Sequence, residues 1–230
     1  MEQIIHFDKQ LLLLLNGSDS VYLDSVIMTL TTAQTWIPLY VALLYVVIRT
    51  SLRENASWHD EVTKRTVRDV FFVLAAAGLL VLLAGTIDDE IVKPLVARWR
   101  PTHDPEIGAL VDTVNDYRGG NYGFFSAHAS NTFSIAIFFS LLMRWRPFVC
   151  AMVIWSLVNC YTRLYLGVHY PGDITVGLLW GAFVGWLVFR LYSRITRFFT
   201  RPATYVHRDL LVPIAVLLLL FTYALLKPLI

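Results

Sequence analysis

The sequence predicts an all-α membrane protein, a polytopic bundle of about six transmembrane helices. Of its 230 residues, 57% are hydrophobic and only 16% are charged. The apolar residues form long blocks instead of alternating with polar ones, and roughly 20 such residues are enough to cross the hydrocarbon layer. We therefore expect a single integral membrane domain over residues 1–230, with no soluble domain.

Six apolar blocks qualify as membrane spans. In chain order they cover residues 28–49, 69–87, 124–143, 147–166, 173–193 and 209–230. The earlier apolar stretch, residues 11–15, is too short to span and has no clear small-residue cleavage site after it. An interfacial helix is favoured there over a signal peptide. Residues 51–64 and 200–209 are expected to be connecting loops.

Basic residues alternate between the two sides of this predicted bundle. They follow the first span (Arg49, Arg53, Lys64, Arg65, Arg68), the third (Arg144, Arg146) and the fifth (Arg190, Arg194, Arg197, Arg201, Arg208). By the positive-inside rule these connections are cytoplasmic, so the loop over residues 88–123 and the turn over 167–172 face outward. The net charge is only +2, which gives no support to a nucleic-acid partner.

Three short polar segments at the ends of these spans lie on the predicted outer side. The first contains Lys93 and Arg100-Pro101, after the second span. Lysine supplies a mobile point charge and arginine a planar fork that matches two phosphate oxygens, so the pair can neutralise an anion without a metal. The alternatives are snorkelling toward headgroups and a simple ion pair of Lys93 with Asp89.

The second segment leads a glycine-bearing loop into the third span. Its key residues are Ser126, Ala127 and His128. Ser126 is a natural N-cap, and the free N–H groups of the first helical turn can bind an anion. A capping serine followed by an incidental interfacial histidine is the alternative.

The third segment joins the fourth and fifth spans and contains Arg163, His169 and Asp173. Pro171 suits the first turn of the fifth helix, which places Asp173 within reach of His169. A carboxylate bonded to one ring nitrogen fixes the tautomer and leaves the other nitrogen free to attack. Three cations, two imidazoles, a hydroxyl and a carboxylate beside a bilayer indicate a site for an anion.

In order and spacing these segments resemble the three motifs of the type-2 phosphatidic acid phosphatase family. The resemblance covers about residues 70–193, and the fold of that family also includes vanadium haloperoxidases and bacterial acid phosphatases. The family usually has Pro-Ser-Gly-His where this chain has Phe125-Ser126-Ala127-His128, and serine where it has Thr162. Ala127 keeps the backbone N–H that a glycine would offer.

The resemblance implies metal-independent phosphoryl transfer through a phosphohistidine, with no cofactor. His169 would be the nucleophile, Asp173 its orienting group and His128 the general acid and base. The phosphate would be held by Lys93, Arg100, Ser126, Ala127 and Arg163. The expected substrate is a lipid phosphate or diphosphate in the bilayer, namely polyprenyl diphosphate or a phospholipid phosphate, with lipid A phosphate as an alternative.

Other classes of protein use parts of the same pattern. A haloperoxidase would oxidise halide with peroxide, and a lipid-binding or transport protein would need no nucleophile. A metal site is not expected, because His103, Asp104, Glu106 and Asp112 match no common ligand spacing. Weaker candidates for headgroup contacts are Tyr117, Arg118, Asn121 and Tyr122.

Overall fold

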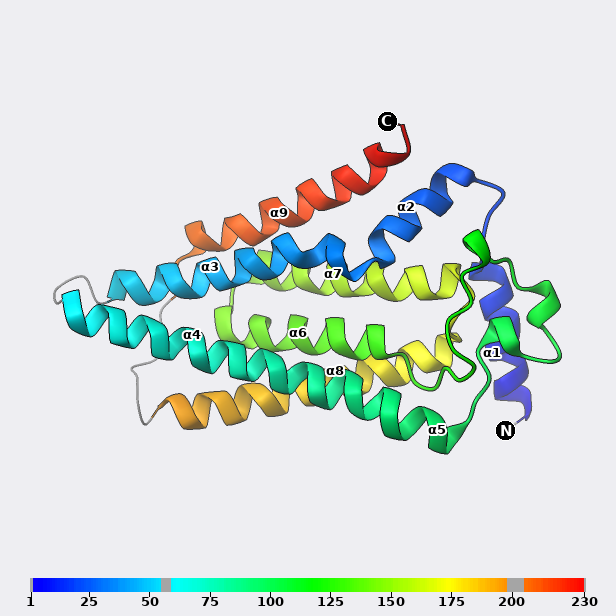
Figure 1. Cartoon of the computed structure of the whole chain (residues 1–230), viewed down its shortest axis with the longest axis horizontal. Coiled ribbons are helices and arrows are strands. Elements are labelled where there is room, and N and C mark those ends of the chain that lie inside the picture. Colours follow the sequence, from blue (N-terminus) through cyan, green and yellow to red (C-terminus); the bar gives the residue numbers. More distant parts are fainter. Residues whose placement is uncertain (1, 55–58, 198–204, 230) are drawn as a thin grey trace.

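The computed structural model describes residues 2–54, 59–197 and 205–229, and the regular elements in these residues are all helices, with no strand (Figure 1). The helices are α1 (Glu2–Leu15), α2 (Val21–Thr31), α3 (Ile37–Glu54), α4 (His59–Val81), α5 (Lys93–Val96), α6 (Ala127–Met143), α7 (Arg146–Tyr165), α8 (Pro171–Thr196) and α9 (His207–Leu226). Short 3-10 turns connect several of them. The predicted all-α fold is confirmed.

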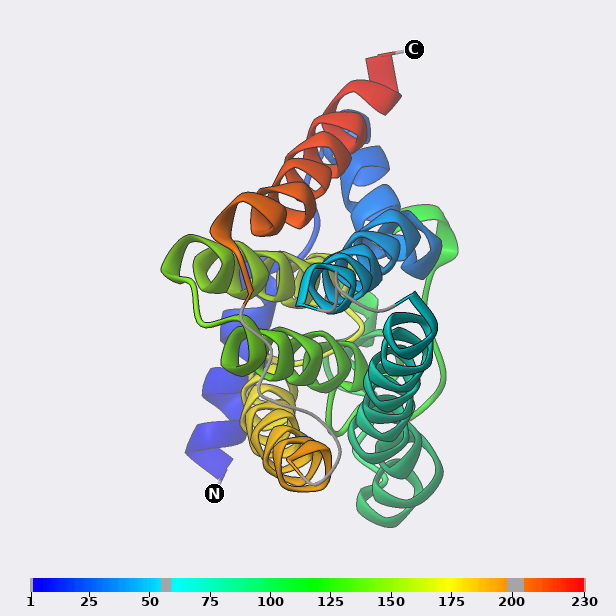
Figure 2. The ribbon, with the colours of Figure 1, turned by 90° about the vertical axis from the view of Figure 1, so that its left-hand side faces the viewer.

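Within the described residues, five helices are long and apolar enough to cross a membrane. They cover Ala33–Arg53, Thr66–Val96, Arg146–Tyr165, Pro171–Thr196 and His207–Leu229. The remaining predicted span corresponds to α6, whose 17 residues make it shorter than these five. A helix of that length reaches only about 25 Å, less than the roughly 30 Å of a hydrocarbon core. The chain is a multi-pass membrane protein in which α6 is enclosed by α4, α7 and α8 (Figure 2).

The first span was predicted as one helix over residues 28–49, and this is wrong. The helix breaks at Thr32, where α2 ends and a 3-10 turn, Ala33–Trp36, leads into α3. Pro38 in the first turn of α3 has no N–H to donate to the preceding turn, so a continuous helix is disfavoured there. The indole of Trp36 donates to the carbonyl of Leu30 at 3.0 Å and holds the break in place.

The second span is longer than predicted. After α4 the helix continues through two π-helical stretches, Leu82–Thr86 and Asp88–Val92, and ends with α5. The outer loop therefore begins at Ala97, not at residue 88, and Lys93 belongs to the last helical turn. The two other predicted loops, over residues 51–64 and 200–209, overlap helices, because α3 reaches Glu54, α4 begins at His59 and α9 begins at His207. Residues 55–58 and 198–204 lie outside the described residues.

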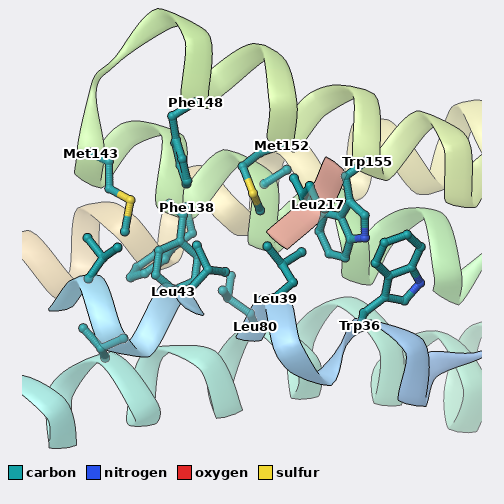
Figure 3. Close-up of a cluster of buried hydrophobic side chains, with 14 of the residues drawn as sticks. Trp36, Leu39, Leu43, Leu80, Phe138, Met143, Phe148, Met152, Trp155 and Leu217 are labelled. Carbon is teal, nitrogen blue, oxygen red and sulfur yellow. The ribbon is translucent and has the colours of Figure 1, made fainter. Parts of the chain in front are cut away.

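The main hydrophobic core lies between α3, α4, α6, α7 and α9. Figure 3 shows its large side chains, which include Trp36, Leu43, Leu80, Phe138 and Trp155. Trp36 and Trp155 meet edge to face, with ring centroids 5.8 Å apart. This core fixes the helices around α6 and so fixes the height at which each polar helix end emerges.

The backbones of α8 and α6 approach each other closely. Glycines recur every fourth residue on one face of α8, at Gly177, Gly181 and Gly185. A Cβ atom built on each would lie 2.8, 2.6 and 2.6 Å from the carbonyl oxygens of Ser126, Ser130 and Ser134. Small residues at this spacing let two membrane helices approach closely. The starts of α6 and α8, which carry the second and third polar segments, are thereby held together.

The amino-terminal helix α1 lies across one end of the bundle and does not run along it (Figures 1 and 2). This is the end at which the loop over residues 97–126 and the turn between α7 and α8 meet. The predicted short helix is confirmed, although it begins at Glu2 and is longer than its apolar part.

Candidate active site

The three polar segments converge on His169, whose side chain is 2% exposed. Burial, together with the positive charges of Arg100, Arg163 and Lys93, lowers the pKa of His169 well below its ordinary value of 6.5. All three cations predicted from sequence therefore surround one imidazole, and that imidazole is neutral at pH 7.

The tautomer of His169 follows from its contacts. Its Nε2 lies 3.0 Å from Nη1 of Arg100, which also donates to the carbonyl of Val168 at 3.0 Å. A guanidinium can only donate, so Nε2 must accept and must carry the lone pair. The proton of the neutral ring is then on Nδ1, on the side of Asp173.

The predicted hydrogen bond between Asp173 and His169 is not formed in this structure. The Nδ1 atom of His169 is 3.6 Å from Oδ2 of Asp173 and has no hydrogen-bond partner among the described residues. The reason is that Oδ2 accepts the backbone N–H of Tyr170 at 2.9 Å, as part of the cap that begins α8. The carboxylate still faces the ring, but the helix start fixes its position.

Arg98 is a site residue that the sequence reasoning missed. Its Nη1 donates to Oδ1 of Asp173 at 2.6 Å, and its guanidinium lies 4.2 Å from the centre of the Tyr170 ring. Arg98 and Arg100 are two residues apart in an extended segment, where alternate side chains share a side. Trp99, between them, contacts the Tyr122 ring instead. The spacing of two was therefore the signal in the sequence that could have placed Arg98 beside Arg100.

The amino-terminal helix also contributes to the site, through Asp8. One oxygen of Asp8 accepts from Nη2 of Arg98 at 2.6 Å, and the other accepts the backbone N–H of Gly172 at 2.8 Å. Although burial opposes a charge on Arg98, the neighbouring carboxylates of Asp173 and Asp8 raise its pKa. Asp8 is separated from Arg98 by 90 residues, so no local pattern could have paired them.

Lys93 lies near the same centre but is already paired. It contacts Asp89, as one alternative predicted, and its Nζ is 3.0 Å from Oδ2 of the fully buried Asp88. The other oxygen of Asp88 accepts the backbone N–H of Phe125 at 3.1 Å. Asp88 therefore connects the end of the α4–α5 helix to the segment that begins α6. The sequence did not indicate this structural role of Asp88.

The start of α6 matches its prediction. Ser126 is the N-cap, fully buried, with its hydroxyl accepting from the backbone N–H of Ala129 at 3.4 Å. Its own N–H donates to the carbonyl of Asp173 at 3.2 Å. The N–H groups of Ala127 and His128 find no acceptor in the described residues. Such free donors at a helix start suit an anion.

Arg163, in the last turn of α7, is 3% exposed. Its guanidinium donates to Thr31 Oγ1 at 2.6 Å and to the hydroxyl of Tyr117 at 3.0 Å. Of the weaker candidates, Tyr117 is thus in contact with a predicted site residue. The others, Arg118, Asn121 and Tyr122, contribute through backbone or ring contacts in the outer loop: the Arg118 and Asn121 carbonyls accept from Thr102 and Arg100.

No group of three or more histidine, cysteine, aspartate or glutamate side chains is placed to hold a metal ion in residues 2–54, 59–197 and 205–229. The acids of the outer loop have other partners. Asp104 accepts from the Tyr170 hydroxyl at 2.7 Å and pairs with Lys9, which also contacts Glu106. These contacts hold α1 against the loop.

A cavity of about 520 Å³ opens between α3 and α4, and His128 is among the residues that line it. These two helices lie close at the end remote from the site and diverge toward it (Figure 1). Its wall is largely apolar, with Tyr40, Leu74 and Ile135 among the lining side chains. His128, predicted from sequence, is thus positioned between the polar cluster around His169 and an apolar cavity.

Comparison with known proteins agrees with this arrangement. Residues 66–197 match the family model described as the PAP2 superfamily. The chain is 37% identical over 198 residues to the lipid A 4'-phosphatase of Bacteroides thetaiotaomicron, covering 85% of this chain and 81% of the relative. It is 33% identical over 194 residues to the lipid A 4'-phosphatase of Porphyromonas gingivalis, covering 84% and 75%.

A more distant relative is the decaprenylphosphoryl-5-phosphoribose phosphatase of Mycobacterium tuberculosis, 37% identical over 117 residues, which are 51% of this chain and 59% of that one. No solved structure gave a significant match. The matched region contains all three polar segments and the α6–α8 pair that brings two of them together. The chain therefore belongs to the PAP2 superfamily, the type-2 phosphatidic acid phosphatase family that its three motifs indicate.

Proposed function

We propose that this protein is a membrane-embedded phosphatase of lipid phosphates that acts through a phosphohistidine at His169 and needs no metal. The expectation of a phosphoric ester hydrolase is confirmed at the level of enzyme class, because the relatives of known activity are lipid phosphatases. The observation that carries the finer proposal is the state of His169: a buried, neutral imidazole whose Nε2 lone pair points at Arg100 among three cations.

In the first step, Nε2 of His169 attacks phosphorus and the bond from phosphorus to the leaving oxygen breaks. Arg100, Arg163 and Lys93, with the free N–H groups at the start of α6, hold the non-bridging oxygens and offset their charge. Arg100 now donates to Nε2, so a bound phosphate would draw the guanidinium onto its oxygens and release the lone pair. The negative charge of the bound phosphate would favour the protonated form of His128, which then gives its proton to the leaving oxygen, and the lipid alcohol departs.

In the second step, a water molecule attacks the phosphohistidine, His128 takes the proton of that water, and inorganic phosphate leaves. The Nδ1 proton of His169 faces Asp173, whose carboxylate stabilises the ring as it becomes positive. General acid–base catalysis typically contributes about 10²- to 10⁴-fold. Losing the nucleophile should therefore cost more than losing His128.

The site is proposed to face the exterior or periplasm. The site lies where α4–α5 ends and where α6 and α8 begin. The basic residues that the positive-inside rule assigns to the cytoplasm lie near the opposite ends of these helices, for example Arg53, Arg144 and Arg194. Motif position and charge bias thus support the same orientation.

The cavity and the relatives support an acylated lipid phosphate as the proposed substrate. An apolar cavity that His128 helps to line can accept a hydrocarbon chain while the phosphate lies among the cations. The relatives that align over most of this chain are lipid A 4'-phosphatases, which favours an acylated lipid phosphate over the polyprenyl diphosphate first expected.

The proposal is tested by trapping the intermediate. Detergent-solubilised protein is mixed with a phosphate-labelled lipid phosphate, quenched within one turnover and digested. The label should be acid-labile and lie on the peptide that contains His169. His169→Ala should release no phosphate and carry no label, whereas His6→Ala, which changes an exposed histidine of α1, should behave as wild type.

The same preparation separates the other classes. A lipid-binding or transport protein would release no phosphate, and a haloperoxidase would oxidise halide when given vanadate and peroxide. Label on a residue other than His169, or equal phosphate release by His169→Ala, would remove the proposed nucleophile.

A further inference from the structure

In the wall of the cavity between α3 and α4, one polar atom, Oδ1 of Asn131, is buried without a hydrogen-bond partner among the described residues. Asn131 lies on α6, three residues after His128, and lines the cavity with it. Its Oδ1 accepts no hydrogen bond in the described part of the chain, although this atom is buried. An unpaired carboxamide oxygen in an apolar setting is costly, which points to a group that is satisfied by a ligand.

The neighbouring polar residues do not share this feature. The hydroxyl of Thr132 donates to the carbonyl of His128 at 2.8 Å and lies 2.8 Å from that of Ser156. The Nδ2 atom of Asn159 donates to the carbonyl of Trp155 at 2.9 Å. Both are therefore explained by packing between helices, whereas Asn131 is not.

A neighbouring glycine also leaves space for the side chain of Asn131. A Cβ atom at Gly85 would lie 2.3 Å from its Nδ2, so the glycine of the adjacent π-helical stretch leaves the room that the carboxamide occupies. Residues three apart lie on one face of a helix and differ by about 4.5 Å in height. Asn131 thus lies about one turn further into the membrane than His128, on the path of the substrate chain.

We propose that Asn131 recognises the first polar linkage of the substrate below its phosphate, and that the enzyme thereby selects acylated lipid phosphates over polyprenyl phosphates. This inference rests on the proposed function. In an acylated lipid the ester or amide group lies a few bonds from the phosphorylated carbon, whereas a polyprenyl chain is hydrocarbon from its first carbon. A carboxamide both donates and accepts, so it can pair with a carbonyl, an amide N–H or a hydroxyl of such a linkage.

A site built to hydrogen-bond one group discriminates against analogues that lack it, because its own polar atoms then stay unpaired. The sharpest probe therefore changes only the linkage. Diacyl phosphatidic acid and its dialkyl ether analogue have the same phosphate and chain lengths, but the ether lacks both carbonyls. Polyprenyl phosphate provides a third substrate without any acyl linkage.

The experiment measures kcat/KM for these three substrates with wild type, Asn131→Leu and Asn131→Ala. Wild type should prefer the diester over the ether by about 10-fold or more. Asn131→Leu, which keeps the volume and removes the polar atoms, should bring this ratio close to one, chiefly by losing activity on the diester. Asn131→Ala should do the same, so that the test survives if either variant folds poorly.

Using a ratio separates recognition from general damage. If Asn131→Leu lowered kcat/KM equally for diester, ether and polyprenyl substrates, Asn131 would be structural and the inference would be wrong. A wild-type protein that hydrolysed diester and ether equally would also overturn it. If wild type hydrolysed none of the three, the proposed function itself would fail, which is a distinct outcome.

Discussion

Arg98 holds Asp173 in an ion pair, with Nη1 2.6 Å from Oδ1, and through its other nitrogen connects this carboxylate to Asp8 of α1. The carboxylate that faces the proposed nucleophile is therefore positioned by the amino-terminal helix as well as by its own helix start. Since Asp8 also accepts the Gly172 N–H, α1 supports the backbone and the side chains of the third segment together.

We expect Asp8→Asn to lower kcat without abolishing it. Loss of its charge weakens the hold on Arg98, which then shifts relative to Asp173, and small displacements of positioned groups can cost roughly 10- to 100-fold. Because Asp8 does not touch the reacting atoms, KM should change little. The measurement is steady-state kinetics of Asp8→Asn beside Asp19→Asn, which should match wild type because Asp19 is exposed and makes no hydrogen bond or ion pair within the described residues. Equal kinetics of the two variants would contradict the positioning role.

Metal removal should leave the activity intact. Lys93, Arg100 and Arg163 already supply three positive charges around His169. A phosphate dianion carries only two negative charges, so these residues can offset its charge without a metal. We expect full phosphate release after dialysis against excess chelator. A loss of activity that added magnesium restores would contradict the metal-independent scheme.

Hydropathy predicted the class of fold and most spans, because long apolar blocks determine which segments can lie in lipid. It could not predict the break at Thr32 or the extension of the α4 helix to Val96. The break depends on Pro38 and on the indole of Trp36 bonding backward, and the extension depends on π-helical turns beside Asp88 and Lys93. A proline, a local bond from an indole to the backbone and π-helical turns all leave the average hydropathy nearly unchanged.

Motif spacing predicted which residues gather around His169, because each motif follows or begins a helix on the same side of the membrane. The roles of Arg98, Asp8 and Asp88 could not be predicted in this way. Each acts through a contact between segments that are tens of residues apart, and a charged loop residue is ordinarily solvated. Asn131 was missed for a different reason: an asparagine in an apolar helix has no spacing pattern, and only its lack of a partner distinguishes it.

The depressed pKa of His169 predicts a pH-dependent stability. Its folded pKa lies below its unfolded value of 6.5, so at pH values between the two the unfolded chain binds a proton that the folded chain does not. The stability that depends on neutral His169 is complete above this value and is lost as the pH falls. The loss should grow steadily as the pH is lowered below 6.5, until the folded protein binds the proton as well.

Thermal unfolding in one detergent, at pH about 7.5 and about 5, measures this loss. His169→Gln cannot bind the proton, so wild type should lose more stability than the variant on acidification. The difference between the two proteins removes contributions from other groups. A difference that stays constant with pH would show that His169 is not held neutral by the fold.

The glycines of α8 give a prediction that joins fold to function. At Gly181 an added Cβ would lie 2.6 Å from the carbonyl oxygen of Ser130, a backbone atom that cannot move aside without moving α6. We expect Gly181→Ala to cost about 1–3 kcal/mol as overpacking and to lower kcat, since α6 carries Ser126 and His128 toward His169.

Gly78→Ala is the matched control, because nothing lies within 4 Å of its Cβ position on the exposed face of α4. That variant should be neutral or up to about 1 kcal/mol more stable, because alanine favours a helix over glycine. Thermal unfolding and phosphate release of both variants test this, and an unchanged kcat in a destabilised Gly181→Ala would separate the packing of α6 on α8 from the alignment of the two imidazoles.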